Sequence, residues 1–176
     1  MSERRVALLR GVNVGGKNKL PMASLAKLFA AAGCTDVVTF IQSGNVVFSA
    51  SAAIAKRLPD ALAEAIEGAH GFRSPVILRT AGELVAAERA NPFPGTEAVH
   101  IAFLADAPTP AAVKSLDPKR SPPDRFVVRG REIYLHLPNG GGQTKLTNAY
   151  FDRTLDTVST IRNWNTLTKL IALAAA

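Results

Sequence analysis

Short apolar runs and stretches with helical spacing alternate along this chain, and their order limits the folds that it can adopt. Val6–Arg10 has the length and composition of a buried strand. After Pro21, which suits the first turn of a helix, apolar residues recur at helical spacing as far as Ala32. Val37–Ile41 and Val46–Phe48 predict two further strands. The turn residues between them, Gln42–Asn45, predict that these two strands form a hairpin.

The pattern continues with a second helix and a fourth strand. Apolar residues recur every four positions from Ile54 to Ile66, and we expect Pro59 to kink this helix or to mark its start. Gly68 and Gly71 are expected to end it. Pro75–Arg79 then predicts a strand, which completes the order β-α-β-β-α-β.

The same order recurs in the second half of the chain. The predicted elements are a strand over Val99–Leu104, a helix over Pro110–Leu116, hairpin strands over Arg125–Val128 and Glu132–Leu137, a helix over Lys145–Leu155, a strand over Val158–Ile161 and a helix over Trp164–Ala175. We therefore predict an α+β fold of two ferredoxin-like units, related by duplication, with an added C-terminal helix. The expected domains are residues 1–80 and 99–176, with a helical and proline-rich connector over 81–98.

Composition narrows the class of protein. With 47% hydrophobic and 20% charged residues, the chain can form a core and is not of disordered type. No apolar run is long enough to cross a membrane, and the apolar stretch near the N-terminus is too short for a secretion signal. The single cysteine, Cys34, cannot form an internal disulfide and is expected in the core. These features favour a cytoplasmic protein with no membrane partner.

Positive charge is concentrated in particular segments. The net charge is +7, and no acidic residue lies between Glu3 and Asp36, a span that holds six lysines and arginines. Such a distribution attracts anions, including nucleotides and nucleic acids, although a basic solvated surface explains it equally well.

The densest polar segment is Arg10–Lys19, which contains three glycines, two asparagines and three cations. Gly11, Gly16 and Lys17 match most of a phosphate-binding P-loop. Asn18 stands where that motif needs a hydroxyl, and Pro21 places the helix start too late. A P-loop is therefore disfavoured. A looser nest of backbone N–H groups for an anion and a plain connecting loop both remain open.

Three more polar motifs stand out. Gln42–Asn45 is either a functional hairpin tip or ordinary turn chemistry. Asn139–Lys145 is a second glycine-rich loop, in which Thr144 can cap the following helix and Lys145 would lie at its positive end. Arg162 and Asn163 precede the C-terminal helix, where both can point outward and Asn163 can also cap.

Several common catalytic sites are not indicated. His70, His100 and His136 have no metal-ligand spacing, and one cysteine excludes a thiolate zinc site. We therefore predict no metal and no cofactor. No nucleophile-elbow or RNA-recognition signature occurs.

Four motifs in a fixed order resemble a known bacterial family. Leu9–Lys19, Pro21-Met22, Gln42–Asn45 and Arg162–Thr166 are similar to those of domain-of-unknown-function family 1697. The resemblance extends from about residue 5 to about residue 172. It implies a small α+β protein with two ferredoxin-like halves, and it implies no activity, substrate or catalytic residue. The second loop departs from the family, because Thr144 stands where a serine is common.

The leading hypothesis is a protein that binds a phosphate-bearing ligand, either a nucleotide or a nucleic acid. Its candidate ligand-binding residues are Arg10, Asn13, Lys17, Asn18, Lys19, Gln42, Ser43, Asn45, Lys145, Arg162 and Asn163. One alternative is a small transferase-like enzyme that uses cationic and polar groups without a metal. Another is a protein-interaction module. The sequence leaves open whether the protein is an enzyme, which residues would be catalytic, and its oligomeric state.

Overall fold

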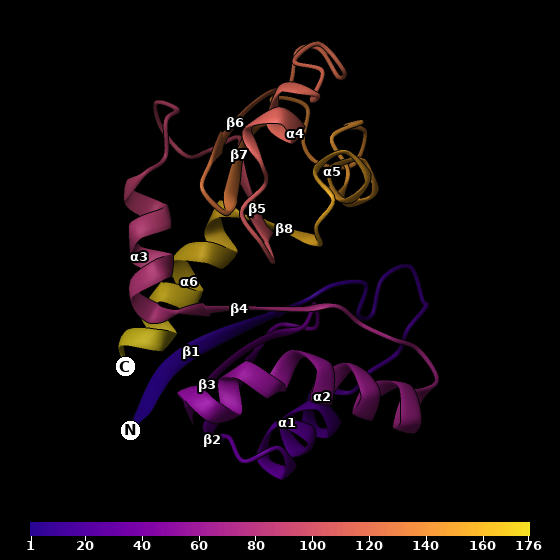
Figure 1. Cartoon of the computed structure of the whole chain (residues 1–176), viewed down its shortest axis with the longest axis vertical. Coiled ribbons are helices and arrows are strands. Elements are labelled where there is room, and N and C mark those ends of the chain that lie inside the picture. The colour runs from indigo at the N-terminus through magenta and orange to yellow at the C-terminus, as the bar shows by residue number, and fades with distance from the viewer. The chain divides into compact units, whose positions relative to one another are not determined.

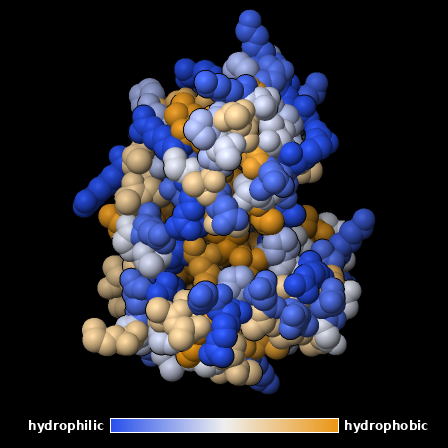
Figure 2. Space-filling model, in the orientation of Figure 1, coloured by the Kyte–Doolittle hydropathy of each residue, from blue (hydrophilic) through white to orange (hydrophobic).

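The computed structural model describes residues 1–176 and divides them into two compact units. Unit 1 comprises Met1–Val85 and Lys169–Ala176, and unit 2 comprises Ala86–Thr168. The division falls within two helices, α3 (Ala81–Arg89) and α6 (Trp164–Ala175). In the view of Figure 2, hydrophilic side chains cover much of the surface of both units.

Unit 1 contains a four-stranded antiparallel sheet in the order β2-β3-β1-β4. Its elements are β1 (Ser2–Leu9), α1 (Met22–Ala31), β2 (Thr35–Phe40), β3 (Asn45–Ser51), α2 (Ala52–His70) and β4 (Val76–Thr80). Ser51 caps α2 by accepting a hydrogen bond from the N–H of Ile54, and Gly71 ends the helix at φ 79°. Pro59 and Gly68 both lie inside α2, so the expectation that Gly68 ends the helix was wrong.

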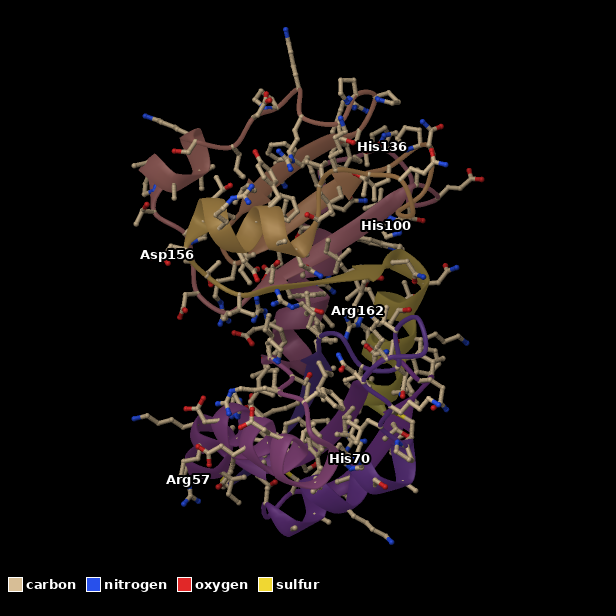
Figure 3. The ribbon with its side chains drawn as sticks, turned by 90° about the vertical axis from the view of Figure 1, so that its right-hand side faces the viewer. Arg57, His70, His100, His136, Asp156 and Arg162 are labelled. Atoms are coloured by element: carbon tan, nitrogen blue, oxygen red, sulfur yellow. The ribbon has the colours of Figure 1, made fainter.

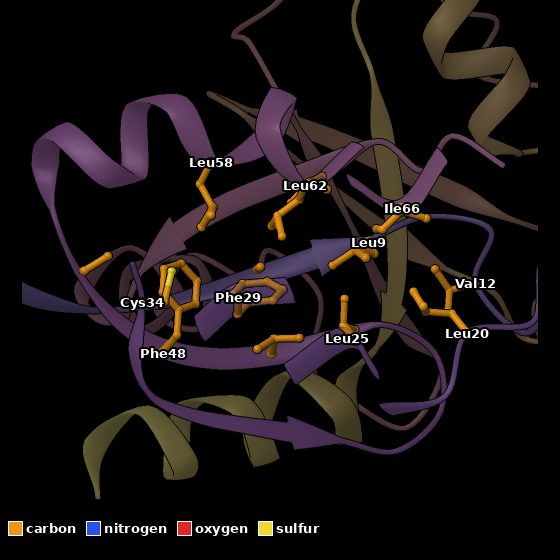
Figure 4. Packing of buried hydrophobic residues seen from close by; sticks show 14 residues of the cluster. Leu9, Val12, Leu20, Leu25, Phe29, Cys34, Phe48, Leu58, Leu62 and Ile66 are labelled. Carbon is orange, nitrogen blue, oxygen red and sulfur yellow. The ribbon is translucent and has the colours of Figure 1, made fainter. Parts of the chain in front are cut away.

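The core of unit 1 lies between one face of this sheet and the helices α1 and α2 (Figures 1 and 4). Alternate residues of β1 and β3, among them Leu9 and Phe48, point into it as strand geometry requires. Phe29 of α1 meets Phe48 with ring centroids 5.2 Å apart. Cys34 is buried in the same cluster, and burial raises the pKa of its thiol, so it is a core residue as predicted.

Unit 2 repeats the arrangement, with strand order β6-β7-β5-β8 and antiparallel pairing throughout. Its elements are β5 (Val99–Leu104), α4 (Pro110–Lys114), β6 (Arg125–Arg129), β7 (Glu132–His136), α5 (Asn148–Leu155) and β8 (Ser159–Asn163). The core cluster joins one face of the sheet to α5 and the α4 region, and it includes Leu116, Tyr150 and Phe151.

The α+β class and the repeated β-α-β-β-α-β order are therefore confirmed, and the ferredoxin-like assignment stays a prediction. Several boundaries in the second half differ from the predicted ones, and two of the errors have a clear cause. Helix α5 begins at Asn148, not Lys145, because Thr147 supplies the cap by accepting from the N–H of Tyr150 at 3.2 Å. Strand β8 extends to Asn163, because its ladder with β5 continues to the pair His100 and Asn163.

Candidate functional site

The glycine-rich segment of unit 1 folds into a miniature hairpin. Val14 and Lys17 form an isolated antiparallel bridge around Gly15 and Gly16, whose φ angles are 57° and 74°. Positive φ at both central positions is the requirement of a tight two-residue hairpin turn, which glycine meets at low steric cost. The N–H of Lys17 donates to the carbonyl of Val14 at 2.9 Å. The segment is therefore an ordered projection, distinct from a P-loop leading directly into a helix.

Two asparagine side chains hold this projection in place. Asn13, at φ 54°, accepts from the N–H of Leu20 at 2.8 Å and donates to the Leu20 carbonyl at 2.9 Å. Asn18, also at φ 54°, donates to the Gly11 carbonyl at 2.9 Å. Val12 and Leu20, which flank the hairpin, are buried in the core. The hairpin is thus anchored at both ends.

The same segment is joined to the tip of the β2–β3 hairpin. The amide of Asn13 also donates to the carbonyl of Gln42 at 2.7 Å, and the N–H of Leu9 donates to the carbonyl of Gly44 at 2.9 Å. A Cβ on Gly44 would lie 2.8 Å from the Cβ of Leu9, so the two segments meet as closely as glycine allows. The hairpin tip and the first loop are therefore in direct contact, and their joint role in binding a ligand stays a prediction.

A third segment completes this end of the unit 1 sheet. The hydroxyl of Ser74 donates to the carbonyl of Arg10 at 2.8 Å, and the N–H of Arg10 donates to the carbonyl of Pro75 at 3.1 Å. Arg73, one residue earlier, is exposed and lies 3.9 Å from the carboxylate of Glu67. We call these three segments, residues 10–20, 41–45 and 73–75, the basic loop cluster.

In the basic loop cluster the lysine side chains are exposed to solvent, whereas the asparagine amides form hydrogen bonds within the protein. Lys17 and Lys19 are exposed, and neither is paired with an acidic side chain, whereas Arg10 is half-buried. Asn45 is fully buried, and its amide donates to Ser43 at 3.0 Å and to the Phe40 carbonyl at 3.3 Å. The side chains of Asn13, Asn18 and Asn45 therefore hold loops together, while the lysines face solvent.

In unit 2, Lys145 does not lie where the sequence placed it. It is exposed and precedes α5 by three residues, so it is not at the positive end of that helix. Its N–H donates to the hydroxyl of Ser121 at 3.0 Å, and its carbonyl accepts from Arg120 at 2.9 Å. Thr144 accepts from the N–H of Leu146 at 3.1 Å instead of capping the helix.

Arg162 is buried, which corrects the expectation that it points outward (Figure 3). Arg162 belongs to β8, where neighbouring side chains point to opposite faces of the sheet. Its side chain therefore lies on the face opposite to that of the exposed Asn163. Its guanidinium donates to the hydroxyl of Thr160 at 2.7 Å, and burial lowers its pKa to about 10. Asn163 accepts from the N–H of Thr166 at 2.8 Å, so its capping role is confirmed.

The grouping of Lys145, Arg162 and Asn163 with the residues of unit 1 in one composite site stays a prediction. Within unit 1, the structure brings together Arg10, Asn13, Lys17, Asn18, Lys19, Gln42, Ser43 and Asn45 in the basic loop cluster.

Sequence reasoning missed a cavity in unit 2. It has a volume of about 600 Å³ and is lined by residues 94–100, 136–138 and 140. His100 of β5 and His136 of β7 both line it, and Figure 3 shows them on the same side of unit 2, with Asp156 on the other. Spacing in sequence could not show this, because the two histidines are far apart in the chain and lie on strands that only the sheet makes adjacent.

Neither a membrane span nor a metal centre is indicated. None of the helices is long and apolar enough to cross a bilayer. No group of three or more histidine, cysteine, aspartate and glutamate side chains is arranged to hold a metal ion.

Comparison with known proteins places the chain in a family. Among solved structures, it is similar to the conserved bacterial protein SP0830 from Streptococcus pneumoniae, with a TM-score of 0.70 and 24% identity over 99% of each chain. At this identity the likeness supports the fold alone. No curated protein sequence matches the chain significantly. The family model described as protein of unknown function (DUF1697) matches residues 2–134, so the chain belongs to that family.

Proposed function

We propose that the basic loop cluster of unit 1 binds the phosphate backbone of a nucleic acid. The observation that carries the proposal is the hairpin that presents Lys17 and Lys19 to solvent without acidic partners while Asn13 fixes its base. Ordered cations lose less conformational freedom on binding than cations on a flexible tail.

The charge of the cluster supports an anionic ligand. Residues 10–20, 41–45 and 73–75 contain four lysines and arginines and no acidic residue. Because exposed lysines bind phosphate as point charges and read no base edge, the expected binding is independent of sequence and sensitive to salt. A projecting hairpin also suits an extended backbone better than a small molecule, which proteins usually enclose in a concavity. A cytoplasmic location, expected from the single cysteine, is part of the proposal.

The test is binding of a labelled single-stranded RNA and a labelled DNA duplex across a range of salt concentrations. We expect Lys17→Ala and Lys19→Ala each to weaken binding at low salt and to reduce the slope of log Kd against log salt by about one. Lys27→Ala is the matched control, because Lys27 is also exposed but lies on α1, outside the cluster.

Two results would overturn the proposal. One is no binding of either nucleic acid at low salt. The other is an equal effect of Lys27→Ala, which would show that net charge alone is responsible. Stabilisation by free nucleotides without nucleic-acid binding would instead favour the transferase-like alternative, since a ligand that binds the folded state must raise the melting temperature.

A further inference from the structure

The basic loop cluster carries exposed apolar side chains as well as cations. Four large apolar residues of the chain are exposed, and two of them, Val14 and Ile41, belong to the cluster, with exposed fractions of 61% and 51%. The other two are Met1, at the N-terminus, and Val38, on β2. Single exposed apolar residues are common on protein surfaces, but these two lie among lysines in a cluster without acidic residues. The cluster therefore offers a ligand apolar surface together with positive charge.

Val14 lies beside one of the exposed lysines. Val14 and Lys17 are the two partners of the isolated antiparallel bridge in the miniature hairpin. Side chains of directly opposed residues in an antiparallel pair point to the same face and lie close together. The apolar side chain of Val14 and the cationic side chain of Lys17 therefore share one face of the hairpin, so a ligand that binds Lys17 there is within reach of Val14.

Ile41 is held at the tip of the β2–β3 hairpin in a conformation that its own side chain disfavours. Its φ is 49°, a value that β-branched residues rarely adopt because the branched Cβ crowds the backbone. The next residue, Gln42, accepts the hydrogen bond of 2.7 Å from the amide of Asn13, which fixes the tip. The strain is not offset by full burial of the side chain, half of which is exposed. Strained residues of this kind cluster at ligand-binding and active sites.

The two apolar residues lie next to one hydrogen bond between loops, because Val14 follows Asn13 and Ile41 precedes Gln42. Apolar surface and exposed lysines thus occur together on ordered loops. A ligand that matches both combines negative charges with accessible apolar faces. An unpaired nucleic-acid strand has this composition, because its phosphates are charged and its bases are free to stack on protein side chains.

A duplex and a membrane match the cluster less well. In a duplex the base faces are stacked inside the helix, and inserting a side chain between them requires unstacking. Two aliphatic side chains offer little surface to offset that cost. Proteins held at anionic membranes by apolar surface use the whole face of an amphipathic helix, which is far larger. Unpaired bases are therefore the occupant that the observations favour.

We propose that Val14 and Ile41 pack on the faces of unpaired bases, so that the basic loop cluster binds single-stranded nucleic acid. The proposal rests on the proposed function, in which Lys17 and Lys19 bind the phosphates, and it adds the form of the nucleic acid and the two residues that select it. Because every base has a face on which a side chain can pack, such contacts tolerate any sequence, as the lysine contacts do.

The experiment compares a labelled single strand of DNA, an abasic strand of the same length and the duplex of the intact strand, at equal salt. The abasic strand keeps the phosphates and lacks the bases, so we expect the intact strand to bind about tenfold more tightly. Ile41→Asn should weaken binding of the intact strand about fivefold and Val14→Thr about threefold, and neither should affect the abasic strand or the duplex. Lys17→Ala should weaken both single strands by the same factor, because it removes a phosphate contact.

Matched variants separate base contacts from structural effects. Ile41→Val keeps an apolar β-branched side chain and should retain most of the affinity. Val38→Thr repeats the change made in Val14→Thr at an exposed position outside the cluster, and it should have no effect. Asparagine accepts φ 49° more readily than isoleucine, so the loss of affinity in Ile41→Asn is expected without loss of stability. Urea unfolding of each variant checks this point.

The outcomes distinguish failure of this proposal from failure of the proposed function. Equal affinity for the intact and abasic strands would overturn the base contacts and leave phosphate binding by the lysines in place. So would an equal effect of Ile41→Asn on the intact strand and on the duplex. No binding of any nucleic acid at low salt would overturn both proposals. Binding to phosphatidylserine vesicles that Ile41→Asn abolishes, without binding to the single strand, would overturn them in favour of a membrane surface.

Discussion

The side-chain amide of Asn13 donates a hydrogen bond of 2.7 Å to the carbonyl of Gln42, joining two loops that are 29 residues apart. The same side chain bonds twice to Leu20, at the other end of its own loop. One residue therefore sets the position of the exposed lysines relative to the hairpin tip.

Replacing Asn13 should destabilise the protein in two ways, by loss of hydrogen bonds and by backbone strain at a positive φ. Asn13→Ala removes three hydrogen bonds and places a Cβ at φ 54° without the local bonding of asparagine, so we expect a loss of about 2–3 kcal/mol. Asn13→Gly removes the same bonds but tolerates this φ, and it should lose about 1–2 kcal/mol. Urea unfolding of both variants measures the difference. Equal stability of Asn13→Ala and the natural protein would contradict the anchoring role.

Gly44 and Gly15 both have a left-handed backbone conformation, but only Gly44 is crowded by a neighbouring residue. In Gly44→Ala, the new Cβ would lie 2.8 Å from the Cβ of Leu9 at φ 81°, and neither atom can move without shifting backbone. We expect a loss of about 2–4 kcal/mol. Gly15→Ala, at φ 57° with nothing within 4 Å, should lose only about 1 kcal/mol. Thermal and urea unfolding compare them, and a larger effect at Gly15 would refute the importance of the Leu9 contact.

Ile41 is strained. It is a β-branched residue at φ 49°, at the tip of the β2–β3 hairpin, and 51% of its surface is exposed. Asparagine accepts this backbone conformation more readily, so Ile41→Asn should stabilise the protein by about 1 kcal/mol. Ile41→Val keeps the β-branched strain and should give no gain. Destabilisation by the asparagine variant would mean that packing of Ile41 outweighs its strain.

Stability should fall on mild acidification because of His100. Burial lowers the pKa of its imidazole in the folded state, so below about pH 6.5, its ordinary value, the unfolded chain takes up a proton that the folded chain resists. The contribution to stability is therefore complete above that pH and is lost as the pH falls toward the folded-state pKa. His100→Phe should show a smaller decrease in unfolding free energy between about pH 7 and pH 5. An identical pH dependence in the variant would refute this assignment.

Much of the fold could be predicted because local patterns determine local elements. Val99–Leu104 and Trp164–Ala175 were predicted with the bounds that the structure gives them. The error at α5 came from two competing hydroxyls. Thr144 and Thr147 are both suitable caps, and the structure uses Thr147 while Thr144 bonds to Leu146.

The candidate site was predictable only in part. Glycine and asparagine at positive φ leave a mark in sequence, so the loop around Gly15 and the tip around Gly44 could be identified. Exposure is different, because it depends on which strand face a residue occupies. Arg162 and Asn163 are neighbours of similar polarity, yet one is buried and the other exposed.

By itself, the sequence determined the alternation of strands and helices and the family, since periodicity, turn residues and short motifs are properties of neighbours along the chain. Only the tertiary structure decided that Asn13 meets Gln42 and that His100 and His136 line one cavity. The physical reason is that strand pairing brings together residues far apart in sequence, and hydrogen-bond partners and accessible atoms are fixed only when that pairing forms.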